Sequence, residues 1–171
     1  MELRNLLYTA QLKLKGPLAI RYPRGRGNFI DWKRDFKKIP FGKGEMIKSG
    51  SQIAIVSIGS IKENVRIAIA TLAEPERVAH YDAKFVKPLD ESLFYKIFNI
   101  FEKIITVEDG VIAGGFGSAV LELAARLNYR GKITCLGIPD VFIEQGSVDE
   151  LQEISKIDVE SIAATITHHL D

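Results

Sequence analysis

The chain has 171 residues, 46% of them hydrophobic, so it can bury one good core but is too short for two comfortable ones. Its 23 Lys and Arg residues balance 22 Asp and Glu residues, which argues against a nucleic-acid binder that works by bulk electrostatics. No apolar stretch approaches the length of a membrane span and no signal-like segment opens the chain, so we expect a soluble, cytoplasmic protein without a membrane partner.

The first forty residues predict a helix, a strand and a linker. Residues 2–14 place leucines at helical spacing, and Gly16-Pro17 should end that helix. A short strand is expected at 18–22. The polar, glycine-containing stretch 25–40 is typical of a connection between domains, and Trp32 is expected to fix it to a domain surface.

A regular alternation of strands and helices is predicted from residue 41 onward. Residues 42–47 suggest an edge strand, and the uniformly apolar run 53–58 predicts a central parallel strand. Ser60 and Glu63 have the spacing of a capping box at the start of a helix. The buried stripe expected on this helix consists of Ile61, Val65, Ala68, Ile69 and Leu72.

The second half of the chain continues the alternation. Further strands are expected at 78–82, 103–107 and 132–136. Helices are expected to begin at Asp90, after the glycine loop 114–117, and near Asp149 and Asp158. Because strand and helix alternate throughout, the predicted fold is α/β, with a mostly parallel sheet between two helical layers.

The turn Arg21-Tyr22-Pro23-Arg24-Gly25 is the first candidate site. Pro23 restricts its own φ and the geometry of Tyr22, which should place Arg24 on a stiff turn at the carboxyl end of a strand. A guanidinium group there is suited to phosphate, because its planar fork can bond two oxygens at once. The alternative is a pair of solvated loop arginines.

The carboxylates Glu108 and Asp109 end a predicted strand just before the glycine loop. Adjacent strand residues point to opposite faces, so they should not share a proton. We expect a structural role, with one carboxylate accepting N–H groups of the loop or pairing with a base across an interface; Lys87 is given a similar role. The loop lacks the spacing and the acidic partner of a dinucleotide fingerprint, so close helix–sheet packing explains its glycines better.

His80 and Cys135 are the remaining candidates for catalytic residues, and the sequence around each favours a structural role. His80 lies among apolar residues of a predicted strand, where a hydrogen-bonded core histidine is commoner than a catalytic one. Cys135 is the only cysteine, and no base that could activate it is identifiable. No spacing typical of a zinc site occurs.

Six short strings occur in order along the chain and carry a resemblance. They are Arg-Tyr-Pro-Arg-Gly (21–25), Pro-Phe-Gly-Lys-Gly (40–44), Phe-Val-Lys-Pro-Leu-Asp (85–90), Thr-Val-Glu-Asp (106–109), Gly-Gly-Phe-Gly-Ser (114–118) and Gly-Ile-Pro-Asp (137–140). Together they resemble the C-terminal part of the 1-deoxy-D-xylulose-5-phosphate synthases, which are thiamine-diphosphate enzymes of the transketolase superfamily. The stretch 142–146 strengthens the likeness to the synthases.

The resemblance implies a domain organisation and a reaction. Residues 1–24 would end a pyrimidine-binding domain, 25–40 would form a linker, and 41–171 would form a transketolase C-terminal-like domain. The full enzyme would join pyruvate to D-glyceraldehyde 3-phosphate with loss of CO2, for isoprenoid precursor synthesis by the non-mevalonate pathway, using thiamine diphosphate and Mg²⁺ in a homodimer. Arg24 falls on the contact to the acceptor's phosphate.

The chain lacks the parts of that family that hold the cofactor. No Gly-Asp-Gly motif occurs, and no segment matches the glutamate that activates the cofactor or the catalytic histidines. We therefore expect no catalytic, cofactor-binding or metal-binding residue in this chain and no activity without the remaining domains. The alternatives are a fragment of a transketolase or of a 2-oxo acid dehydrogenase β-subunit, or a free-standing α/β module that binds an anion or a partner near Arg24.

Overall fold

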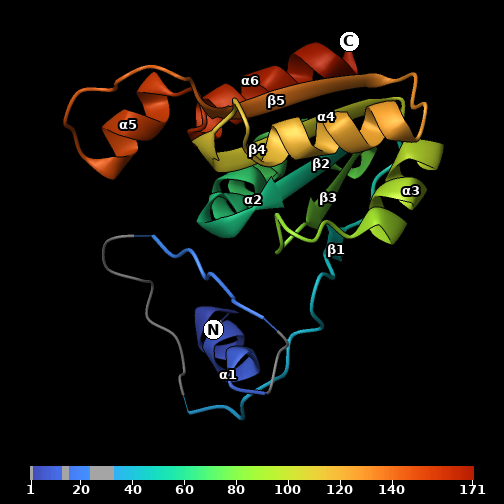
Figure 1. The fold of residues 1–171 in the computed structure, drawn as a ribbon. Coiled ribbons are helices and arrows are strands. Elements are labelled where there is room, and N and C mark those ends of the chain that lie inside the picture. Colours follow the sequence, from blue (N-terminus) through green and yellow to red (C-terminus); the bar gives the residue numbers. More distant parts are fainter. Residues whose placement is uncertain (1, 13–15, 24–32) are drawn as a thin grey trace. The chain divides into compact units, whose positions relative to one another are not determined.

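The computed structural model describes residues 2–12, 16–23 and 33–171. The chain divides into two compact units, residues 1–41 and residues 42–171 (Figure 1).

The first unit is built on helix α1 (Glu2–Ala10), which is shorter than the predicted 2–14, because residues 11 and 12 form a turn and residues 13–15 lie outside the described part. A later segment of the unit lies along this helix. Thr9 Oγ1 accepts the N–H of Ile39 at 2.9 Å, and Asn5 Oδ1 accepts the N–H of Lys37 at 3.1 Å. The ring of Tyr8 stacks on that of Phe36, with 5.1 Å between centroids.

The strand predicted at 18–22 is wrong, since residues 17–23 have no regular secondary structure. A strand exists only within a hydrogen-bonded ladder, and no partner strand for this segment occurs among the described residues. Trp32 lies outside the described residues, and its role in the linker stays a prediction.

The second unit contains a five-stranded sheet in the order β1-β3-β2-β4-β5. The strands are β1 (Glu45–Lys48), β2 (Ile53–Ile58), β3 (Val78–Asp82), β4 (Lys103–Val111) and β5 (Lys132–Ile138). All neighbours pair in parallel except β1, which runs antiparallel to β3 and has an irregular register between Met46 and Lys48. Strand β2 lies at the centre, as its uniform apolarity predicted, and its first five residues are buried.

Four of the five α-helices of this unit form two layers, one on each face of the sheet, and the fifth, α5, stands to one side (Figure 1). The five helices are α2 (Lys62–Thr71), α3 (Glu91–Ile100), α4 (Phe116–Arg126), α5 (Val148–Ile154) and α6 (Val159–Leu170). Helices α2 and α6 bury one core with residues such as Val65, Ile162 and Ile166. Helices α3 and α4 bury the other, with Phe94 and Phe116 among its residues. The predicted three-layer α/β fold is confirmed.

The predicted helix starts were correct at Asp90 and wrong at Ser60. Asp90 accepts the N–H of Leu93 and begins α3. The segment Gly59–Ile61 instead forms a 3-10 turn, so α2 begins at Lys62 without a side-chain cap. Glu63 pairs with Arg66, whose Nη2 lies 2.6 Å from Glu63 Oε1. Asp158 caps α6, and Asp149 lies in the first turn of α5.

Candidate functional site

The predicted phosphate contact, Arg24, lies outside the described residues, so its role stays a prediction. The residues just before it are described, and Arg21, Tyr22 and Pro23 are all exposed.

The carboxyl edge of the sheet is organised around Glu108, which lies on β4 and is only 5% exposed. Its Oε2 accepts the N–H of Phe116, and its Oε1 accepts the N–H of Gly117, both at 2.8 Å. These are first-turn N–H groups of α4, which have no partner within the helix and carry the positive end of its dipole. Glu108 therefore satisfies this helix end with a negative charge, and the predicted bonding of a carboxylate to the glycine loop is confirmed.

Glycine is required at three positions near Glu108, because other atoms lie where a Cβ would be. A Cβ on Gly115 would lie 2.4 Å from Glu108 Oε2, and one on Gly137 would lie 2.9 Å from Glu108 Cγ. A Cβ on Gly117 would meet Cys135 Sγ at 2.8 Å, where α4 packs on β5. The loop is thus filled by a protein carboxylate and by helix–sheet packing, which is the non-nucleotide interpretation favoured by the sequence.

Asp109 and Glu108 lie in different surroundings. Glu108 is buried and bonded to main-chain N–H groups, whereas Asp109 is the next residue on β4 and half-buried. Lys87 is exposed, and its role stays a prediction. At the start of α3, Lys43 Nζ lies 3.0 Å from Asp90 Oδ1.

His80 belongs to a buried polar network on β2 and β3. Its Nε2 lies 2.8 Å from Ser57 Oγ, and both side chains are at most 1% exposed. Burial lowers the pKa of His80 from 6.5 to about 4, with Lys62 and Lys48 adding to the shift and Asp82 opposing it. A serine, a histidine and an aspartate thus come together, but no substrate can reach a fully buried hydroxyl. The arrangement is a neutral histidine in a core hydrogen bond, as predicted.

Asp82 was not singled out by the sequence. It is 1% exposed at the end of β3, where Oδ2 pairs with Lys62 Nζ at 2.8 Å and Oδ1 accepts the N–H of Lys84 at 3.1 Å. The only available signal was an aspartate at the carboxyl end of a buried strand. The pair joins β3 to the first turn of α2, which is a structural role.

Cys135 lies on β5 and is half-buried beside Gly117. Burial raises the pKa of its thiol, which keeps it protonated near neutral pH and unsuited to nucleophilic attack. The described residues contain no cluster of three or more His, Cys, Asp or Glu side chains that could hold a metal ion. In the same part of the chain, no helix is both long enough and apolar enough to span a bilayer.

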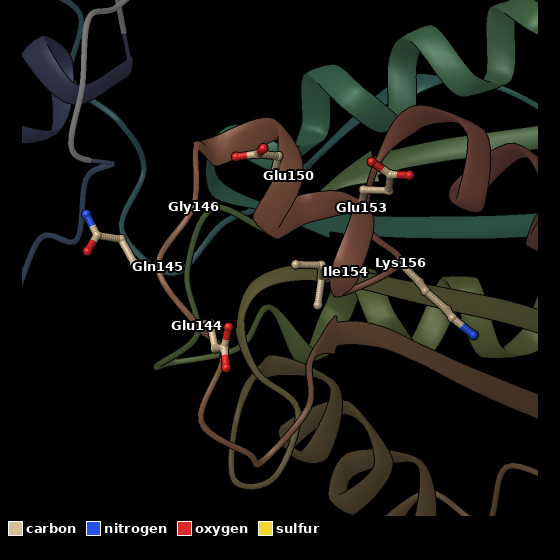
Figure 2. A pocket seen from close by; sticks show the side chains of 7 residues that line it. All are labelled: Glu144, Gln145, Gly146, Glu150, Glu153, Ile154 and Lys156. Atoms are coloured by element: carbon tan, nitrogen blue, oxygen red, sulfur yellow. The ribbon is translucent and has the colours of Figure 1, made fainter.

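A hollow of about 620 Å³ lies beside α5, between that helix and the loop that precedes it. Three carboxylates line it, those of Glu144 on the loop and of Glu150 and Glu153 on α5 (Figure 2). One cation, Lys156, lies just beyond the helix. The apolar side chain of Ile154 also lines it.

A search against protein families matches residues 42–162 to the family described as transketolase, C-terminal domain. Among curated proteins, the 1-deoxy-D-xylulose-5-phosphate synthase of Cytophaga hutchinsonii is 52% identical over 167 residues, which is 96% of this chain and 26% of that protein. The synthase of Bacteroides thetaiotaomicron is 49% identical over 164 residues, covering 94% and 25%. The chain therefore spans about a quarter of the length of these relatives.

Solved structures agree on the fold. One described as "Split gene transketolase, inactive beta4 tetramer" is similar with a TM-score of 0.69 and 24% identity, over 78% of this chain and 44% of that chain. The transketolase of Leishmania mexicana is similar with a TM-score of 0.51 and 17% identity, over 74% and 18%.

Proposed function

Because the chain belongs to the transketolase C-terminal domain family and corresponds to the C-terminal part of 1-deoxy-D-xylulose-5-phosphate synthases, we propose that it works as that part of such an enzyme. The whole enzyme would condense pyruvate with D-glyceraldehyde 3-phosphate, with loss of CO2. The observation that carries this proposal is the 49–52% identity to synthases over at least 94% of the chain. The transketolases are less similar, at 24% identity or lower, and support the fold alone.

The residues described here do not fit the diphosphate of thiamine diphosphate. Among the described residues, the glycine loop 114–117 at the start of α4 has the sequence that most resembles a phosphate-binding loop, and the carboxylate of Glu108 already accepts two of its N–H groups. A phosphate in that loop would meet a buried negative charge at the distance of a hydrogen bond. We therefore place the cofactor and its Mg²⁺ on the remaining domains and assign this chain no catalytic step.

The contribution of the chain is then to pack against those domains and to supply one substrate contact. Residues 1–24 would complete the pyrimidine-binding domain, and Arg24 would hold the phosphate of the acceptor. The whole enzyme would act as a homodimer, and the isolated chain would have no synthase activity.

A domain exchange tests the proposal. The C-terminal quarter of the Cytophaga hutchinsonii synthase is replaced by this chain, and formation of 1-deoxy-D-xylulose 5-phosphate is measured. We expect activity from the fused enzyme and none from this chain alone or from the truncated synthase. As a control matched in fold, the C-terminal domain of the Leishmania mexicana transketolase should not restore activity. A folded but inactive fusion would contradict the proposal.

A further inference from the structure

Residues 139–154 form a projecting arm, which consists of a loop followed by helix α5. No residue of the arm is buried. In Figure 1, α5 stands to one side of the sheet. The arm is nevertheless regular, because Ser147 and Glu150 form a capping box and Asn64 Nδ2 on α2 donates to Gln152 Oε1 at 2.8 Å.

The arm carries apolar side chains that the unit itself does not use. The exposed ones are Val141, Phe142, Val148 and Ile154. Phe142 is completely exposed, and Val141 and Ile154 are 66% and 61% exposed. Apolar surface gathered on an ordered segment is typical of an interaction site, because its hydrophobic free energy is gained only when a partner covers it.

The negative charge of the arm restricts the kind of surface that can bind it. Its sixteen residues include five carboxylates and no Lys, Arg or His. Three of these carboxylates, on Glu144, Glu150 and Glu153, line the hollow in Figure 2 together with Ile154. The complementary surface is therefore an apolar cleft with Lys or Arg at its rim. A second copy of the arm does not fit, since it would bring five more carboxylates to the same place.

We propose that the arm docks this chain onto the remaining domains of the synthase, with Phe142 as the central anchor in a basic-rimmed apolar cleft. The inference rests on the proposed function. The docking partner is the part of the enzyme that this chain does not contain, which in the matched relatives is about three quarters of the protein. Large apolar side chains at the centre of such contacts carry much of the binding energy.

The test compares the isolated chain with the fused enzyme described above, using amide hydrogen exchange. Docking should slow exchange in residues 141–154 by about tenfold or more in the fused enzyme relative to the isolated chain. Phe142→Ser should abolish this slowing in the fused enzyme and leave the unfolding midpoint of the isolated chain unchanged. Ile100→Ser is the matched control, because Ile100 is 63% exposed on α3, outside the arm. It should preserve the slowing.

The possible outcomes separate this inference from the proposed function. If the fused enzyme is active but the arm exchanges as fast as in the isolated chain, docking by the arm is refuted and the proposed function stands. Equal effects of Phe142→Ser and Ile100→Ser also refute the arm as the anchor. Protection in the isolated chain that rises with protein concentration would assign the arm to a second copy and overturn the proposal. An inactive fused enzyme counts against the proposed function itself.

Discussion

Replacing Glu108 by glutamine should lower the free energy of unfolding of the unit 42–171 by about 2–4 kcal/mol. In the structure its two carboxylate oxygens accept the N–H groups of Phe116 and Gly117, at 2.8 Å each, and the side chain is 5% exposed. The amide of glutamine keeps one acceptor but turns an NH2 group toward the second N–H. One buried donor is then left without a partner, and the attraction between the carboxylate and the helix dipole is lost.

Urea unfolding followed by circular dichroism measures this effect. With a slope of about 2 kcal/mol per molar urea, the midpoint should fall by about 1–2 M. Glu122→Gln is the matched control, because Glu122 lies on the same helix but is exposed, and its change should stay within about 0.5 kcal/mol. Glu108→Ala should be rescued in part by formate, which can occupy the space of the lost carboxylate. Equal midpoints for Glu108→Gln and Glu122→Gln would refute the assigned role.

Three further outcomes are expected. Because burial holds the pKa of His80 at about 4, against 6.5 in the unfolded chain, its contribution of about 3 kcal/mol is complete above pH 6.5 and is lost as the pH falls toward 4. His80→Gln should flatten the dependence of the urea midpoint on pH in that window, and an unchanged slope would contradict this. Asp90→Ala removes the acceptor used by the N–H of Leu93 and by Lys43 Nζ, so thermal unfolding should show a loss of about 2 kcal/mol, with Asp90→Asn recovering part. In the fused enzyme, Arg24→Ala should lower kcat/KM for the phosphorylated acceptor by about 30- to 1,000-fold and barely change that for unphosphorylated glyceraldehyde. Equal losses for both aldehydes would assign Arg24 to the fold.

The sequence predicted the sheet well because its central strands are apolar on both faces. The run 53–58 occupies the centre, and the stripe on α2 packs on one face of the sheet. Local sequence signals gave wrong predictions where contacts with other segments determine the secondary structure. Residues 18–22 form no strand without a partner, and the 3-10 turn at Gly59 moves the start of α2 past Ser60.

Contacts of the site were predicted only where the two partners lie close together in the sequence. Glu108 and Phe116 in the glycine loop are eight residues apart, so the sequence already showed a carboxylate near the free N–H groups of a helix start. The pairing of Lys62 with Asp82 and the exposure of Phe142 were not visible in the sequence, because both depend on how distant segments pack. Arg24 was chosen from the Pro-Arg-Gly turn and from the resemblance, and its role remains a prediction.

The two edges of the sheet differ in how they resist aggregation. Strand β1 has four residues, an irregular register and the charged side chains of Glu45 and Lys48, all of which make it a poor template for another strand. Strand β5 has seven residues, carries a charge only on Lys132, and pairs on one side alone among the described strands. Unwanted growth of the sheet between molecules would therefore begin at β5, and substitutions that improve solubility belong on that strand rather than on β1.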